Sequence, residues 1–278
     1  MKIKKVLNNN AVIALNDKNE ELVVTGLGLA FQKRPGEYLA VEKIERIFTM
    51  ENKEISRKLR DLISEIPLQY VEVTEEIITY AKEKNGKNLN ENIYLTLTDH
   101  ISFAIERSKQ EINMSNPMKW EIRRFYEDEY NIGLAALDII NNRLGVELPK
   151  DEAASIAMHL VNAELNEEMP KVVNMIKIIQ DALNIIKYHY RVELEEDSLS
   201  YQRLVTHLKF FAQRIINCEN TDKSEDHLFE IISRQYEEAY LCAQKIKKYA
   251  KEKYDFIISK AELTYLIVHI ERVIVSHK

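Results

Sequence analysis

Two stretches of this chain match each other: Thr-Asp-His-Ile-Ser-Phe-Ala-Ile-Glu-Arg at 98–107 and Val-Thr-His-Leu-Lys-Phe-Phe-Ala-Gln-Arg at 205–214. A histidine stands third in each, with Phe three residues and Arg seven residues after it. His100 and His207 are therefore 107 residues apart in the same context. Apolar residues recur around them at spacings of three and four, which indicates an α-helix.

A second pair of histidines repeats at nearly the same distance. His159 lies in Met-His-Leu-Val-Asn-Ala-Glu and His269 in Val-His-Ile-Glu-Arg-Val, and a glutamate precedes each by seven residues, Glu152 and Glu262. The chain thus contains a duplicated helical unit that keeps its imidazoles in register. Packing does not need imidazole, and a polar ring in an apolar helix is costly unless it has a partner. The four matched histidines are therefore predicted to be functional.

The remaining histidines have no counterpart in the other unit. We expect them to be ordinary core or boundary residues with one satisfied hydrogen bond; they are His189, His227 and His277.

Composition excludes several classes of protein. The 278 residues are 45% hydrophobic and 30% charged, as in a soluble globular protein, and no apolar run approaches the roughly 18 residues of a membrane span. Cys218 and Cys242 lie in apparently helical segments without a Cys-x-x-Cys spacing, so we expect reduced thiols in a cytoplasmic protein. The first 50 residues carry eight basic and six acidic side chains, whereas the whole chain has a net charge of −6. A nucleic-acid site is therefore more compatible with the N-terminal segment than with the acidic remainder.

The first 50 residues read as a small antiparallel sheet. Short β-prone runs around Ile3 and Val6, at 11–15, at 21–25 and at 44–50 are separated by polar turn clusters. A domain of this size has little core of its own, and dimerisation is a common remedy.

Helical periodicity takes over beyond residue 55. Helices are predicted to open at 73–76 with Thr74 as the cap, to run from 119 through 141, and to start at 149 before His159. Ser259 and Glu262 have the spacing of a capping box. The stretch 165–173 is predicted to link the two units. The expected fold is thus a small β domain followed by two tandem homologous all-α bundles.

Three chemistries fit the matched histidines. A metal site is disfavoured because zinc wants three or four ligands and because Asp99, beside His100, has Thr206 as its counterpart. Acid–base catalysis would need a nucleophile or a substrate pocket that the sequence does not show. Phosphoryl acceptance suits a neutral imidazole near pH 7, and an Arg at +7 lies two turns along the same helix face.

The chain resembles, over its whole length, the BglG/SacY family of transcriptional antiterminators. Its head resembles the family's co-antiterminator RNA-binding domain, and its helical units resemble the two phosphotransferase regulation domains. The motifs that carry this resemblance are Met1-Lys-Ile-Lys-Lys-Val-Leu-Asn-Asn-Asn10, Gly26-x-Gly28-x-Ala30-Phe31-Gln32-Lys33, Thr98-Asp-His100, His159-Leu-Val-Asn-Ala-Glu164, Val205-Thr-His-Leu-Lys-Phe-Phe211 and Val268-His-Ile-Glu-Arg-Val273.

The resemblance implies an RNA-binding domain at 1–55, a first regulation domain at 60–168 and a second at 172–278. It implies a dimer, without enzymatic activity, cofactor or metal, that grips an RNA hairpin in the leader of a sugar operon transcript, with β-glucosides the expected sugar class. The hairpin would then block an overlapping terminator.

The resemblance also implies which head residues face RNA: Lys5, Asn10, Gly26, Phe31 and Gln32. An aromatic ring near basic residues suits base stacking, and Asn amides suit the base edges of an unpaired loop. Spacing alone instead predicts that Phe31 is a core residue. Relatives can carry Arg between the two glycines, where this chain has Leu27, so loop specificity is expected to differ.

By resemblance, the four histidines are phosphorylation sites. His100 and His159 would receive phosphate from the sugar-specific enzyme II permease and silence the protein. His207 and His269 would receive it from the phosphocarrier HPr and activate the protein.

Two alternatives come from other classes. A metal-dependent hydrolase with a helical His/Asp site is the runner-up, and metal content would discriminate it. A DNA-binding activator with the same regulatory domains is disfavoured because no helix-turn-helix precedes residue 60.

Overall fold

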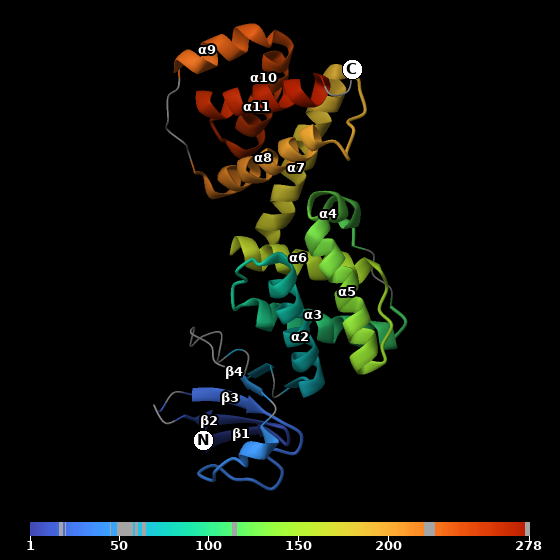
Figure 1. The fold of residues 1–278 in the computed structure, drawn as a ribbon, viewed down its shortest axis with the longest axis vertical. Coiled ribbons are helices and arrows are strands. Elements are labelled where there is room, and N and C mark those ends of the chain that lie inside the picture. The colour runs from blue at the N-terminus through green and yellow to red at the C-terminus, as the bar shows by residue number, and fades with distance from the viewer. Residues whose placement is uncertain are drawn as a thin grey trace. The chain divides into compact units, whose positions relative to one another are not determined.

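The fold comprises two compact units, Met1–Glu167 and Glu168–Lys278. The computed structural model describes residues 1–16, 19, 21–44, 46–48, 58, 61–62, 65–112, 116–219 and 226–275. In Figure 1 the chain passes from strands at its N-terminus to helices through the rest of its length. The predicted fold class, a small antiparallel sheet followed by helical bundles, is confirmed.

Within the described residues of the head, four antiparallel strands pair in chain order. They are β1 (Lys2–Asn8), β2 (Ala11–Leu15), β3 (Glu21–Thr25) and β4 (Arg46–Phe48). The four predicted β-prone runs all contain a strand; residues 49 and 50 of the last run lie outside the described residues. A short 3₁₀ helix, Val41–Lys43, precedes β4.

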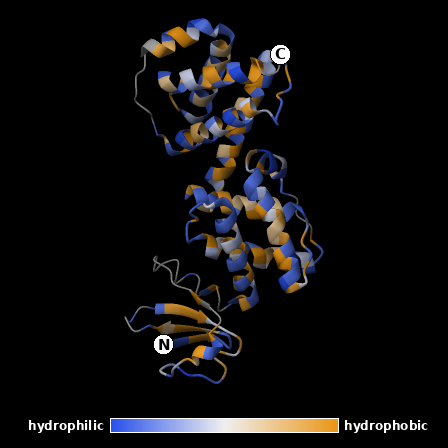
Figure 2. Ribbon diagram, in the orientation of Figure 1, coloured by the Kyte–Doolittle hydropathy of each residue, from blue (hydrophilic) through white to orange (hydrophobic). Residues whose placement is uncertain are grey.

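The core of the sheet consists of aliphatic side chains. Strands β2 and β3 carry hydrophobic colours in Figure 2, and nearly all their side chains are buried. Leu29 and Ala30, from the loop after β3, pack into the same core. This loop is therefore fixed to the sheet at its centre.

The first unit continues with helices that enclose an aliphatic core. They are α2 (Leu68–Asn85), α3 (Ile93–Lys109), α4 (Lys119–Phe125), α5 (Glu127–Leu144) and α6 (Asp151–Leu165). The prediction that Thr74 caps the first of these helices is wrong. Thr74 lies buried inside α2, and its hydroxyl donates 2.8 Å to the carbonyl of Tyr70, because the helix begins after Pro67.

The predicted single helix from 119 through 141 is also wrong, because it breaks at Tyr126. Tyr126 has φ −132° and ψ 55°, which ends α4 and starts α5. The second unit repeats the break at Tyr236, with φ −122° and ψ 63°. The two tyrosines stand 110 residues apart, the same offset as His159 and His269, but neither Pro nor Gly marks the break.

The second unit is also helical. Its helices are α7 (Met169–Tyr190), α8 (Leu199–Asn217), α9 (Asp226–Gln235), α10 (Glu237–Tyr254) and α11 (Lys260–Val275). The predicted linker at 165–173 contains the boundary between the two units, which falls between Glu167 and Glu168. Its second half is helical, because α7 already begins at Met169. Pro170 stands in the first turn of α7, where its missing N–H has no helical partner to lose.

The predicted capping box at Ser259 is half confirmed. The Glu262 N–H donates 3.2 Å to the Ser259 hydroxyl. The Glu262 side chain does not complete the box, because it contacts Arg214 and His207 instead.

The described residues include no helix with the length and apolar character that crossing a bilayer requires.

The close packing of α5 against α6 indicates that the two units differ in how they tolerate a methyl group at one matched helix position. A Cβ added to Gly133 would lie 2.2 Å from the backbone oxygen of Ala153, whereas the matching position in α10 is already an alanine, Ala243. We expect Gly133→Ala to destabilise the protein by about 1–3 kcal/mol through overpacking, although alanine favours helix by about 1 kcal/mol. Ala243→Gly should lose only about that propensity. Urea unfolding measures both, and a Gly133→Ala protein as stable as wild type would contradict the close approach.

Candidate functional site

In each unit, the helices bring the two matched histidines of that unit into contact with each other. In the first unit, His100 on α3 and His159 on α6 have ring centroids 4.9 Å apart, tilted by 42°. In the second, His207 on α8 and His269 on α11 have centroids 5.2 Å apart and rings stacked within 25°. Residues about 60 positions apart thus form one two-imidazole site per unit.

A buried glutamate anchors the first site. Glu152, on α6, places one carboxylate oxygen 3.0 Å from His100 Nε2 and the other 2.8 Å from an Arg107 guanidinium nitrogen. Only 7% of the Glu152 side chain is exposed. Because His100 and Arg107 both lie on α3, this one carboxylate joins α3 to α6.

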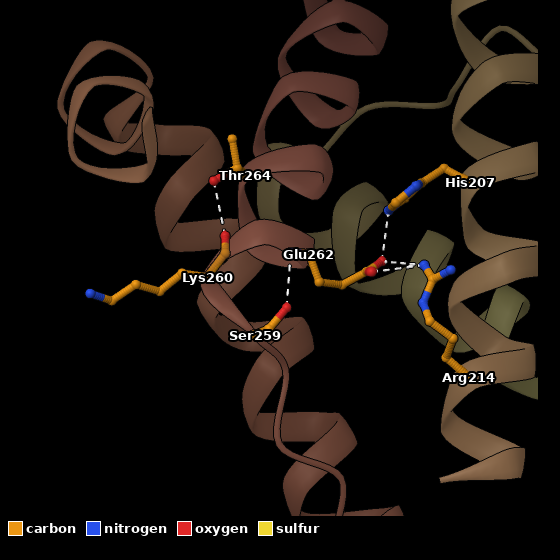
Figure 3. Close-up of polar contacts among 6 residues, drawn as sticks. All are labelled: His207, Arg214, Ser259, Lys260, Glu262 and Thr264. Atoms are coloured by element: carbon orange, nitrogen blue, oxygen red, sulfur yellow. Dashed lines mark hydrogen bonds and ion pairs between the residues drawn. The ribbon is translucent and has the colours of Figure 1, made fainter. Parts of the chain in front are cut away.

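The second site has the same construction (Figure 3). Glu262 on α11 lies 3.0 Å from His207 Nε2, and both its oxygens accept from one Arg214 nitrogen, at 2.8 and 2.7 Å. Figure 3 shows the Glu262 side chain reaching from its own helix to the helix that carries the other two residues. We call the Glu–Arg–His set of each unit the carboxylate clamp: Glu152, Arg107 and His100 in the first unit, and Glu262, Arg214 and His207 in the second.

The spacing of seven residues explains the geometry. Seven residues are nearly two helical turns, so side chains separated by seven lie on one face, about 10 Å apart along the axis. His100 and Arg107 therefore face the same neighbour, as do Glu152 and His159 on the opposing helix. The glutamates were visible in the sequence as the residues seven before the second histidine of each unit, but the sequence alone assigned them no contact.

The clamps set the charge states of the site. Burial alone would raise the pKa of Glu152, but His100 and then Arg107 hold it below its usual value. Burial is likewise outweighed at Glu262, whose pKa is lowered by His207 and Arg214. Both carboxylates are therefore ionised at neutral pH.

In each unit, the histidine that follows the glutamate on the same helix, His159 or His269, is held neutral. Burial, reinforced by His100, lowers the pKa of His159 to about 3. Burial also lowers the pKa of His269 to about 4, with His207, Arg272 and Arg203 acting in the same direction. A neutral imidazole keeps one nitrogen lone pair and is a competent nucleophile.

Other predicted neighbours take no part in the clamp. Asp99 is exposed, and the carboxylate beside His100 is that of Glu152. His189 lies 3.3 Å from Glu238, as expected for a boundary histidine with one partner. The side chain of His227 and the whole of His277 lie outside the described residues.

Phe103 and Phe210, the residues three after the first histidines, are exposed rather than packed in the core. Each therefore presents an aromatic ring on the outer side of the helix that carries the histidine. Among the residues with described side chains, no three of His, Cys, Asp and Glu are arranged to hold a metal ion.

Four of the candidate RNA-binding residues lie in or against the loop after β3: Asn10, Gly26, Phe31 and Gln32. The fifth, Lys5, lies on β1. Asn10 holds this loop: its side-chain oxygen accepts from the Gly28 N–H at 2.8 Å, and its backbone oxygen accepts from the Gly26 N–H at 2.9 Å. Gly26 is buried, and Gly28 has φ +62°, a conformation that favours glycine. Asn10 and Gly26 thus fix the conformation of the loop through hydrogen bonds.

The loop presents apolar side chains to solvent. Phe31 is 60% exposed and Leu27 is 78% exposed, and Gln32 and Lys5 are exposed as well. The spacing-based prediction that Phe31 is a core residue is therefore wrong. Leu29 and Ala30 fill the core instead, which leaves Phe31 outside.

The comparisons with known proteins match the whole chain. The model of the CAT RNA binding domain matches residues 1–57, and that of the PRD domain matches residues 75–163 and 180–273. Transcription antiterminator LicT of Bacillus subtilis (strain 168) is 48% identical over 274 residues, which are 99% of each chain. The beta-glucoside operon antiterminator of Dickeya chrysanthemi is 46% identical, over 98% of this chain and 96% of that protein. The crystal structure of GlcT CAT-PRDI matches 59% of this chain and 97% of its own, at 32% identity and a TM-score of 0.50.

Because His159 and His269 are neutral in the folded chain, we expect them to lower the free energy of unfolding in mild acid. An unfolded chain takes up a proton at His159 near pH 6.5, whereas the folded chain resists it down to about pH 3. Stability is therefore complete above pH 6.5 and falls as the pH drops below it, by at most about 1.4 kcal/mol per pH unit for one such group.

Urea unfolding of the full chain between pH 7 and pH 5 checks this prediction. We expect His159→Gln to flatten the slope in part, because His269 still contributes. The control is Gln202→Ala, at an exposed position of α8 that does not titrate, which should keep the wild-type slope. Equal slopes for wild type and His159→Gln would contradict a neutral His159. The comparison with the variant is needed because burial raises the pKa of Glu164 to about 7, which acts in the opposite direction over the same pH range.

Proposed function

Because the chain belongs to the BglG/SacY family of transcription antiterminators, which join a CAT RNA-binding domain to two PRD domains, we propose that it binds a hairpin in the leader mRNA of a sugar-utilisation operon. The bound hairpin blocks an overlapping terminator and lets transcription continue. The observation that carries this proposal is the full-length match together with a paired-histidine site in each PRD domain. β-Glucosides are the proposed sugar class, in line with the Dickeya relative.

The domains keep their predicted boundaries within this proposal: 1–55 for RNA binding, 60–168 for the first regulation domain and 172–278 for the second. The protein acts as a homodimer and catalyses no reaction of its own. Each head contributes one RNA-binding surface, and the small size of the sheet supports pairing of two heads.

The exposed part of the loop after β3 supports RNA binding. Phe31 offers a ring for stacking on an unpaired base, and Gln32 and Lys5 offer donors to base edges and phosphates. Asn10 and Gly26 act by holding the loop, and the Asn10 amide N–H₂ remains as a donor to RNA. Leu27 adds an apolar contact where relatives place arginine.

The two clamps support regulation by histidine phosphorylation. His100 and His159 accept phosphate from the sugar-specific enzyme II permease, and this silences the protein when the sugar is absent. His207 and His269 accept phosphate from HPr, and this activates it. A phosphoryl group adds roughly −1.5 to −2 charges beside an ionised buried glutamate, so the modification strains the contact between the two helices.

The exposed loop predicts that RNA affinity depends on one ring. We expect Phe31→Ala to weaken binding of the leader hairpin by about 1–3 kcal/mol, the usual value of one base–aromatic stack. The matched control is Tyr38→Ala, which removes another exposed aromatic residue from the head. Fluorescence anisotropy measures the affinity, with the hairpin chosen by sequencing RNA that co-purifies with the full chain. Equal affinity of Phe31→Ala and wild type would contradict the proposed RNA surface.

The second regulation domain predicts activation by charge. We expect His207→Asp with His269→Asp to shift the chain toward dimer and to raise hairpin affinity without HPr, because aspartate partly mimics phosphate. Replacement of both by alanine should leave activity low and insensitive to HPr. Sedimentation and anisotropy measure the two effects, and His189→Asp is the control. No change in either quantity for the double-Asp protein would mean that these histidines are structural.

A further inference from the structure

Both first histidines turn the same ring nitrogen toward the clamp. His100 Nε2 lies 3.0 Å from a Glu152 oxygen, and His207 Nε2 lies 3.0 Å from a Glu262 oxygen. These two Nε2 atoms are buried and meet hydrogen-bond geometry with no group, so the 3.0 Å approach to the carboxylate is an ion-pair contact. Each histidine side chain is still 16% or 13% exposed. The exposed part of each ring therefore lies away from Nε2.

The carboxylate decides which nitrogen carries the proton. A neutral imidazole has one N–H donor and one lone pair, and an ionised carboxylate only accepts. With the lone pair at Nε2, two acceptors would face each other at 3.0 Å in a buried site, at a high electrostatic cost. The stable tautomer therefore places the hydrogen on Nε2 and leaves the lone pair on Nδ1.

The arginine keeps the carboxylate in this role. Arg107 contacts Glu152 at 2.8 Å, and Arg214 contacts both oxygens of Glu262. A guanidinium at this distance favours the ionised carboxylate and restricts its rotation. The geometry is that of a buried carboxylate that orients a histidine through one ring nitrogen while the other nitrogen reacts.

We infer that Glu152 and Glu262 are positioning residues that fix the Nε2–H tautomer, so that His100 and His207 accept the phosphoryl group on Nδ1. This inference rests on the proposed function and specifies the reacting atom of the same site. It does not extend to His159, whose Nδ1 is buried without a hydrogen-bond partner.

Phosphoryl transfer from HPr to His207 requires no movement of a proton between residues. The Nδ1 lone pair attacks the phosphorus of the HPr phosphohistidine, and a new P–N bond forms as the donor's P–N bond breaks. The electron pair of the broken bond stays on the donor ring, which held a proton on its other nitrogen and leaves as neutral imidazole. His207 becomes a phosphoimidazolium that keeps its Nε2–H, and the Glu262 carboxylate faces the new positive charge.

The direct test is the identity of the phosphohistidine isomer. The full chain, labelled with ¹⁵N-histidine, is phosphorylated by HPr charged from phosphoenolpyruvate and studied by ¹⁵N and ³¹P NMR. The signal that disappears in His207→Ala is assigned to His207. We expect the Nδ1 isomer there, and an Nε2–H tautomer of His207 in the unphosphorylated chain.

Variants of the clamp test the positioning role. Glu262→Gln should lose the fixed tautomer and slow phosphorylation of His207 by roughly 100-fold or more, the scale expected when an orienting carboxylate is removed. Glu262→Asp should restore part of both. The matched control is Glu252→Gln, the same change at an exposed site of α10, which should alter neither.

The outcomes separate the inference from the function beneath it. Phosphorylation of His207 on Nε2 in the wild-type chain overturns the inference and leaves the proposed function standing. Absence of phosphate from all four histidines contradicts the proposed function, and the inference falls with it. The isomer is read in the wild-type chain, so the result does not depend on whether Glu262→Gln folds.

Discussion

A buried glutamate that bridges an arginine and a histidine on the neighbouring helix is the interaction on which each regulatory unit depends. A carboxylate in an apolar interior is costly unless it is paired and hydrogen-bonded. Arg214 donates to both oxygens of Glu262 and Arg107 donates to one oxygen of Glu152, while His207 and His100 lie 3.0 Å from these carboxylates. Because the partners stand on another helix, the need to satisfy the carboxylate fixes how the two helices meet.

The histidine pair follows from this constraint. Once the glutamate reaches its partners, the histidine seven residues after it on the same helix lies against the ring on the opposing helix, as the short centroid distances record. Burial then keeps His159 and His269 neutral. Each site therefore combines an ionised carboxylate, a histidine oriented by it and a second, uncharged histidine.

Such a site responds strongly to added phosphate. A phosphoryl group brings like charge close to a carboxylate that cannot easily accept a proton, and it offers the arginine a second anion. A decisive shift between two states takes about 5.5 kcal/mol. In the proposed dimer, several desolvated phosphates and their symmetry mates would act together on the carboxylate clamps.

The sequence predicted those features that depend on pattern. Alternating and periodic apolar residues located the strands and most helices. The duplication at offsets of 107 and 110 picked out four histidines, two in each unit, and the structure brings the two of each unit into contact. Prediction from the sequence failed where tertiary packing decides, because the break at Tyr126 has no local breaker. Phe31 was placed in the core by spacing, but Leu29 and Ala30 occupy that core.

The contact of Glu152 with His100 was also beyond the sequence, because it joins helices that periodicity cannot place side by side. The resemblance to the family supplied the RNA-binding role of the head. It also supplied the phosphorylation role of the matched histidines, for which residue chemistry alone left three readings open. The comparisons confirm that family and give no support to the hydrolase alternative.

The coupling between Glu262 and Arg214 tests the central claim most directly. Free energies of unfolding of wild type, Glu262→Gln, Arg214→Met and the double variant form a double-mutant cycle. If the clamp holds α8 to α11, each single change costs about 3–5 kcal/mol, because it leaves a buried partner unsatisfied, and the double variant costs little more than either. Additive costs, with a coupling no larger than the roughly 0.5 kcal/mol of an exposed ion pair, would contradict the claim that this glutamate organises the site.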